Sequence, residues 1–223
     1  MEYRGLVQKS FLVDETMIGT VHKFNVIDKE ILTQCINDYY SRKHYQTSSM
    51  NKCSPGSSEE LLTEICQQSL GIKLKFCSGN FYKHSIPYLP HTDYRMNQDN
   101  DLNVVIPLEF KGTTPYLIVF DQIWNKDSVT WCMNKELIHF EINTGIEGRP
   151  ADYPSVNGLT DLPIADKLYT YLKHYPKDML FGLSGNAFSF TPGSIIAFNN
   201  KQIHCTSSFI GEKLGISLRF KIL

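Results

Sequence analysis

The sequence predicts an α+β protein that is mainly β, with N-terminal helices packed on one face of a largely antiparallel sheet. Two amphipathic patterns with capping residues occupy the first 70 residues. From residue 72 onward the pattern changes to short runs rich in β-branched and aromatic residues, which is typical of strands. At 223 residues we expect a single domain, with 1–71 as helical support and 72–223 as the β core.

The first helix is expected over 29–40, where apolar residues recur on one side. Asp28 directly precedes it, and an aspartate in this position accepts a hydrogen bond from a backbone N–H group of the first turn. A strand is expected earlier in the chain, at 6–13, where the apolar content is high.

The second helix is expected over 59–70, where an apolar stripe repeats at helical spacing. Ser57 and Glu60 fit a capping box at its start, and Gly71 suits the backbone conformation that ends many helices. The stretch 47–58 is rich in serine, lysine and glycine, so we expect a loop between the two helices.

Eight strands are expected in the β core, because short β-branched and aromatic runs alternate with turn residues. We place them at 72–78, 80–85, 102–110, 115–121, 136–142, 194–198, 202–208 and 214–222. A polar loop and a helix near 162–174 form an insertion at about 143–175, with Asp161 as the helix cap and Pro163 in its first turn. The mixed stretch 121–160 is long enough to serve as a lid over a substrate.

The composition argues against several classes of protein. With 22 basic and 23 acidic residues the chain is nearly neutral, so we expect no nucleic-acid partner. No apolar run approaches membrane-spanning length, and the first residues lack the apolar core of a signal peptide. Six cysteines lie without CxxC spacing, which favours reduced thiols and a cytoplasmic location. The sequence does not predict an oligomeric state.

The most informative motif is His91-Thr92-Asp93. Strand side chains repeat with period two, so His91 and Asp93 project from one face. His204 is a distant third ligand, and two histidines with one carboxylate form the set that holds non-haem Fe(II) with open coordination positions. Arg219 follows 15 residues later and offers an always-charged fork for a carboxylate.

His139 and Glu141 form a competing pair on another expected strand. In a jelly-roll of two facing sheets, the distal histidine follows the first two ligands by several strands. Four expected strands separate Asp93 from His204. Only one or two follow Glu141, which is too few to bring the chain back across the barrel to the distal histidine. We therefore favour the set containing His91 and interpret the other pair as polar residues on an outer strand face.

These motifs resemble those of the Fe(II)/2-oxoglutarate-dependent dioxygenase superfamily, above all its prolyl-hydroxylase-like and phytanoyl-hydroxylase-like members. The resemblance rests on His91-Thr92-Asp93, on the turn and strand from Pro192 to His204, and on the terminal strand carrying Arg219. It covers about 72–223 and implies a double-stranded β-helix, or jelly-roll, core. The first 70 residues resemble the superfamily only in that helices are expected to pack against one sheet.

The resemblance also implies roles for individual residues. Fe(II) would be held by His91, Asp93 and His204. Arg219 would bind the distal carboxylate of 2-oxoglutarate, with Ser217 beside it on the same strand face, and Tyr82 resembles a tyrosine that reaches the cosubstrate in prolyl-hydroxylase-like enzymes. Lys213, nine residues after the distal histidine, is an alternative anchor, although it follows an apparent turn. Two weaker candidates are Asn103 and Arg95.

The expected function is hydroxylation of a C–H bond in a small molecule or a protein side chain, with 2-oxoglutarate and O2 consumed and succinate and CO2 released. Ascorbate would serve as a reductant. Because related halogenases lack the metal-binding acid, the presence of Asp93 favours hydroxylation or a similar two-electron oxidation. The alternatives are a non-catalytic jelly-roll that binds a metal or ligand, and an inert scaffold in which the triad is coincidental.

Overall fold

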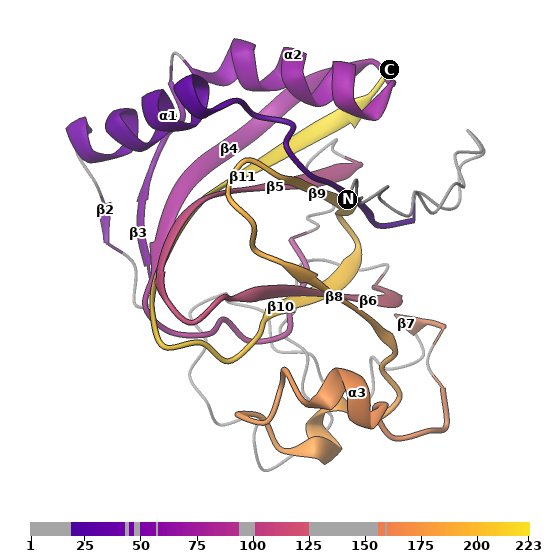
Figure 1. Cartoon of the computed structure of the whole chain (residues 1–223). Coiled ribbons are helices and arrows are strands. Elements are labelled where there is room, and N and C mark those ends of the chain that lie inside the picture. The colour runs from indigo at the N-terminus through magenta and orange to yellow at the C-terminus, as the bar shows by residue number, and fades with distance from the viewer. Residues whose placement is uncertain are drawn as a thin grey trace, which may run out of the picture.

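The strands form two antiparallel sheets that face each other, with two helices on the outer side of the larger sheet (Figure 1). The computed structural model describes residues 19–42, 45–46, 50–56, 58–93, 101–124, 156–158 and 160–223. This arrangement is a jelly-roll with a helical layer, so the expected α+β, mainly β fold class is confirmed.

Within the described part of the chain, the larger sheet has seven strands. In spatial order they are β1 (Val21–Lys23), β9 (Ile195–Asn199), β5 (Leu102–Gly112), β11 (Gly211–Ile222), β4 (Leu74–His84), β3 (Met50–Cys53) and β2 (Tyr45–Gln46). The smaller sheet contains β10 (Gln202–Thr206), β6 (Tyr116–Trp124), β7 (Val156–Asn157) and β8 (Gly185–Ser189), the last two both paired with β6. The last strand of the chain, β11, therefore lies in the middle of the larger sheet, between β5 and β4.

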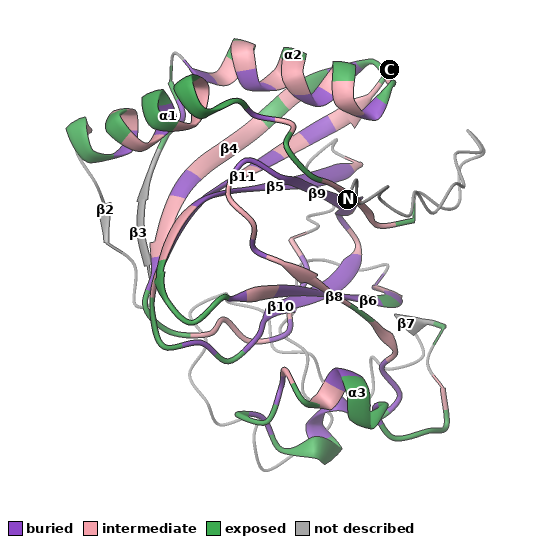
Figure 2. Ribbon diagram, in the orientation of Figure 1, coloured by how far each residue is buried: buried purple, intermediate pink, exposed green. Residues whose placement is uncertain are grey.

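Helices α1 (Lys29–Ser41) and α2 (Ser58–Leu70) bury one face each against the larger sheet and expose the other (Figure 2). Alternate β11 residues point to these helices, and Ile216, Leu218 and Phe220 belong to the apolar cluster formed there. Side chains on the opposite face of β11 therefore point between the two sheets. This alternation places Lys213, Ser217 and Arg219 on the inner face, as the sequence predicts for the last two.

The cap of α1 is observed as predicted: the Asp28 carboxylate accepts a hydrogen bond of 2.8 Å from the Ile31 backbone N–H. We expect Asp28→Ala to lower the free energy of unfolding by about 1 kcal/mol, since this N–H loses its partner. Chemical denaturation measures the change, and Asp28→Ser, which keeps a capping oxygen, should restore most of it. An unchanged free energy of unfolding in the alanine variant would contradict this role.

The prediction of separate strands at 72–78 and 80–85 is wrong, because β4 runs unbroken from Leu74 to His84. Gly79 lies at the expected break, and a Cβ there would approach the Leu218 side chain to 2.7 Å. The glycine is thus used for close packing against β11 and not for a turn. The expected loop at 47–58 is also partly wrong, since it contains β3.

The helix expected near 162–174 is reduced to one short turn, α3 (Asp166–Tyr169), preceded by Ala165 without a side-chain cap. The prediction that Asp161 caps a longer helix is therefore wrong. The spacing of apolar residues correctly indicated burial, because Ile164, Leu168 and Leu172 are buried against the smaller sheet. Tertiary packing buries these residues in turns as well as it would in a helix.

Other predictions fall outside the described residues: the strands at 6–13 and 136–142, the residues Arg95, His139 and Glu141, and the lid over 121–160 apart from its first residues and residues 156–158 and 160. Those first residues, 121–124, belong to β6 and end at the buried Trp124. Neither β1 nor β8 was expected from the sequence.

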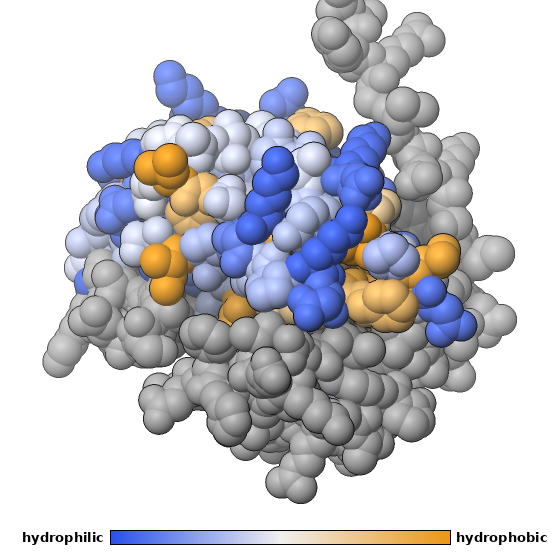
Figure 3. All heavy atoms as spheres, turned by 90° about the horizontal axis from the view of Figure 1, so that it is seen from below, coloured by the Kyte–Doolittle hydropathy of each residue, from blue (hydrophilic) through white to orange (hydrophobic). Residues whose placement is uncertain are grey.

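None of the described helices is long and apolar enough to cross a membrane. On the face shown in Figure 3, hydrophobic side chains of described residues are scattered between hydrophilic ones. Isolated exposed apolar residues are normal on protein surfaces and mark no binding site by themselves. Four cysteines have described side chains, and none of them is in a disulfide bond: Cys35, Cys66, Cys77 and Cys205.

Candidate metal centre

Two histidines far apart in sequence are joined through their backbones. His204 lies in β10, and His91 follows Pro90 in the segment after β4. The two residues form an isolated antiparallel bridge, in which His91 N–H donates to the His204 carbonyl at 2.9 Å and the reverse bond is 2.8 Å. This bridge holds the imidazole rings 4.2 Å apart between their centroids.

Both imidazoles are oriented in the same way by a backbone carbonyl. Nδ1 of His91 donates to Leu89 O at 2.7 Å, and Nδ1 of His204 donates to Gln202 O at 3.1 Å. A carbonyl oxygen only accepts, so Nδ1 of each ring carries a proton, and Nε2 is the atom left to bind a metal. Burial, reinforced by His204, lowers the pKa of His91 to about 3. His91 is therefore neutral at physiological pH, as a metal ligand requires.

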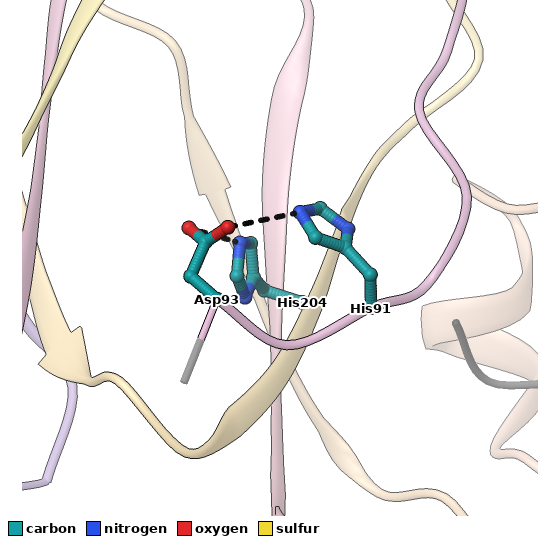
Figure 4. Close-up of side chains that lie close together, drawn as sticks. All are labelled: His91, Asp93 and His204. Atoms are coloured by element: carbon teal, nitrogen blue, oxygen red, sulfur yellow. Dashed lines mark ion pairs between the residues drawn. The ribbon is translucent and has the colours of Figure 1, made fainter. Parts of the chain in front are cut away.

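Asp93 completes the group, with its carboxylate facing both imidazoles (Figure 4). Its Oδ1 lies 3.8 Å from His91 Nε2, and its Oδ2 lies 3.6 Å from His204 Nε2. Burial alone would raise the pKa of Asp93, but the positive charge of Arg219 beside it holds the pKa well below its ordinary value. The carboxylate is therefore ionised.

The ligand atoms of His91, Asp93 and His204 all lie within 4.8 Å of one another. Two imidazoles and one carboxylate on one side of a centre form a donor set that suits non-haem Fe(II) and leaves positions open. The residues present thus fit the metal that the sequence motif implies. Cys205, next to His204, points to the opposite side, into the apolar cluster around α3, and lies away from this group.

A second feature of the inner face is a buried lysine. Lys213 is only 4% exposed, and its Nζ donates a hydrogen bond of 2.9 Å to Thr206 Oγ1. Aromatic rings surround the ammonium group, with the Phe190 centroid at 5.0 Å and the Tyr82 centroid at 5.7 Å. Among the described residues it has no carboxylate partner. Burial lowers the pKa of Lys213 to about 7.

Tyr82 lies between the lysine and the metal-ligand group. It pairs with Gly215 across β4 and β11, and a Cβ on Gly215 would lie 2.7 Å from the Tyr82 hydroxyl oxygen. The glycine therefore leaves room for the phenol to cross the inner face of β11. Burial and the negative charge of Asp93 raise the pKa of Tyr82, so its hydroxyl stays protonated and can donate a hydrogen bond.

Arg219 lies beside the metal ligands and not beside the lysine. Its Nη2 is 3.1 Å from Asp93 Oδ1. The guanidinium group that was expected to bind the cosubstrate is therefore already ion-paired with Asp93. Ser217 is half-buried on the same face of β11. Thr206 was missed from the sequence, although strand period two puts it on the same face as His204, with which it shares β10.

Comparison with known proteins identifies the fold. No family model and no curated protein matches the sequence. Among solved structures, a 2OG-Fe(II) oxygenase-family oxidoreductase from Burkholderia pseudomallei superposes with a TM-score of 0.55 at 12% identity, covering 91% of this chain and 84% of that one. The non-haem α-ketoglutarate-dependent epimerase SnoN, from nogalamycin biosynthesis, has a TM-score of 0.53 at 10% identity and coverages of 91% and 77%.

The carbocyclase SnoK, from the same biosynthesis, superposes with a TM-score of 0.51 at 10% identity, covering 91% of this chain and 79% of that one. The chain therefore has the double-stranded β-helix fold of the Fe(II)/2-oxoglutarate-dependent oxygenases. The resemblance expected from the sequence is confirmed at the level of the fold.

Proposed function

We propose that this protein is an Fe(II)- and 2-oxoglutarate-dependent oxygenase. The observation that carries the proposal is the convergence of two imidazoles and one ionised carboxylate, His91, His204 and Asp93, inside the fold of this enzyme class. SnoN, which has a similar fold, has been crystallised in complex with Fe3+ and α-ketoglutarate. When bound, the iron and the cosubstrate would supply the oxidising chemistry, and the protein would position them and exclude water.

Lys213 is the anchor that we propose for the distal carboxylate of 2-oxoglutarate, in place of Arg219. A buried ammonium group without a carboxylate partner is costly, and an anionic ligand would offset that cost. The Thr206 hydroxyl and the Tyr82 ring lie near the ammonium group, and the hydroxyls of both residues are suited to bind the same carboxylate. Arg219 fits this role less well because Asp93 already occupies its guanidinium group.

Within the reaction, the residues of this chain hold and orient the reactants. His91, His204 and Asp93 would bind one side of the metal and leave the other for the cosubstrate and oxygen. Lys213 would fix the far end of the cosubstrate, so that its keto acid end lies at the metal. The substrate class that we propose is a small molecule or a protein side chain, oxidised at a C–H bond and most simply hydroxylated.

The assay for this proposal is succinate formation from 2-oxoglutarate, with Fe(II) and ascorbate in air, across panels of amino acids, short peptides and lipids. A substrate should stimulate succinate production and gain one oxygen atom from labelled O2. Because SnoN and SnoK are an epimerase and a carbocyclase, products without added oxygen must also be analysed by mass spectrometry. A ligand-binding jelly-roll would bind metal and 2-oxoglutarate but form no succinate with any of them.

The affinity for 2-oxoglutarate should fall as the pH rises above about 7. Lys213 has a pKa near 7 in the empty site, and a bound carboxylate would raise that pKa, so binding takes up a proton above pH 7. The Kd should then increase by up to tenfold per pH unit between about pH 7 and 9. Titration of the Mn(II)-loaded protein by calorimetry measures it.

Lys213→Arg is the matched control for this pH effect, because arginine stays charged throughout the range. Its Kd for 2-oxoglutarate should show little dependence on pH, whatever its absolute value. A flat pH profile in the unaltered protein would show that Lys213 does not carry the charge that binds the cosubstrate.

A further inference from the structure

Asp93 is held from two neighbouring strands of the larger sheet. Arg219 in β11 and Asn103 in β5 are directly paired in the register of the sheet. Arg219 Nη2 lies 3.1 Å from Asp93 Oδ1, and Asn103 Nδ2 donates to Asp93 Oδ2 at 3.3 Å. Each carboxylate oxygen therefore has its own donor, and both donors come from strands other than the segment that carries Asp93.

Asp93 needs such support because its backbone lies outside regular structure. The last bridged residue before it is His91, and neither Thr92 nor Asp93 belongs to a strand. The backbone ladder therefore fixes His91 and His204 but leaves the carboxylate to be oriented by its side-chain contacts. A ligand that is free to rotate would bind metal less tightly than one that is held in place.

The β-sheet is locally irregular at Arg219. The register of β11 against β4 shifts between Arg219 and Phe220, so that Arg219 pairs with Ser78 and Phe220 with Phe76. Irregularities of this kind redirect side chains next to functional sites. Here the irregularity coincides with the residue that contacts the metal-binding carboxylate.

Asn103 is fully buried, and one of its polar atoms has no partner in the part of the chain that the structure describes. Its Nδ2 must face Asp93, because its Oδ1 would be repelled by the carboxylate. Among the described residues, the Asn103 Oδ1 is consequently left buried without a hydrogen bond, and so is Arg219 Nε. Leaving two buried polar atoms unpaired is unfavourable, so packing alone does not explain this arrangement. The two atoms are an acceptor and a donor on paired residues, which suits a bridging water or a short rotation that joins them.

We propose that Arg219 and Asn103 are positioning residues that clamp Asp93, so that it gives one carboxylate oxygen to the metal. Arg219 is the stronger, charged donor and holds Oδ1. Oδ2, which lies nearer to a histidine ligand atom and receives only a neutral amide hydrogen bond, is the oxygen that binds the ion. This inference rests on the proposed metal site, but it does not depend on turnover.

The clamp and the cosubstrate-anchor role of Arg219 make opposite predictions. If Arg219 clamps Asp93, its loss weakens metal binding first. If it anchors the cosubstrate, its loss weakens 2-oxoglutarate binding and leaves the affinity for metal unchanged. Both affinities are measured by calorimetry on the full chain, with Mn(II) alone and then with 2-oxoglutarate added to the metal-saturated protein.

We expect Arg219→Gln to raise the Kd for Mn(II) on the order of 10- to 100-fold, and Arg219→Lys to recover part of the loss. Lys221→Gln is the matched control, because Lys221 is a cation on the same strand that ion-pairs with Asp101 and not with Asp93. Its Kd for Mn(II) should equal that of the unaltered protein. The electron paramagnetic resonance spectrum of bound Mn(II) should change in the glutamine variant and not in the control.

Asn103→Ala is the second variant, since it removes a single neutral hydrogen bond and keeps the charge balance if Arg219→Gln does not fold. It should also weaken Mn(II) binding. Unchanged Mn(II) affinity in the folded variants, with weakened 2-oxoglutarate binding in Arg219→Gln, would overturn the clamp. If the unaltered protein binds Mn(II) but forms no succinate, the proposed function fails. The clamp is then still supported or overturned by the Mn(II) affinities of the variants alone.

Discussion

Replacing Asp93 by alanine is expected to abolish succinate formation and to weaken metal binding by more than about 100-fold. This exceeds the range for residues that merely support a ligand, because the substitution removes the only anionic donor of the triad. It would also leave the half-buried Arg219 guanidinium beside the metal without its carboxylate. Calorimetric titration with Mn(II) and a succinate assay measure the two effects.

The matched control is Asp166→Ala, which removes an exposed carboxylate that ion-pairs with Lys177 away from the site. Metal affinity and turnover should be the same in this variant as in the unaltered protein. Asp93→Glu tests geometry, since it keeps the charge but moves the carboxylate by one methylene group. If Asp93→Ala retained turnover, Asp93 would not be a metal ligand.

The second large effect is expected at Lys213. Removing one partner of a buried charge pair costs about 2–5 kcal/mol, and about 1.4 kcal/mol corresponds to a tenfold change in affinity. Lys213→Met should therefore raise the Kd for 2-oxoglutarate by about 30-fold or more, while the affinity for Mn(II) stays unchanged. Because the empty protein loses a buried ammonium group, its thermal stability should not fall.

Lys83→Met is the control for this substitution. Lys83 also lies on the larger sheet, in β4, but it ion-pairs with Glu212 at 2.9 Å near the surface. Its loss should leave the Kd for 2-oxoglutarate unchanged. A normal cosubstrate affinity in Lys213→Met would instead return the anchoring role to Arg219 or Ser217.

Much of the site was predictable because it depends on local spacing. The period of two along a strand puts Ser217 on the same face as Arg219. The spacing of His91 and Asp93 correctly indicated that they lie together, although the expected strand is wrong there, since Asp93 follows the isolated bridge at His91 and lies outside any strand. Counting strands to His204 favoured this set over His139 and Glu141. The cap at Asp28 and the helix after it likewise follow from residues adjacent in sequence.

Local spacing does not predict which of the two cations, Lys213 or Arg219, contacts Asp93 and which is left to bind the cosubstrate. Both lie on the inner face of β11, six residues apart, and both are cations. Which one approaches Asp93 depends on the pairing of β11 with β4 and β5 and on the irregularities in that register. From the sequence, Lys213 was expected to lie just after a turn. This expectation is wrong, since β11 begins at Gly211 and Lys213 is a buried residue of this strand.

The measurement that tests the central claim most directly is an anaerobic spectroscopic titration of the full chain. Fe(II) is added first and 2-oxoglutarate second, while the visible absorption is recorded. The account predicts a metal-to-ligand charge-transfer band that appears only with both, is lost in Asp93→Ala, and decays with succinate formation when air and substrate are admitted. Absence of the band at saturating Fe(II) and 2-oxoglutarate, with no succinate formed in air, would contradict it.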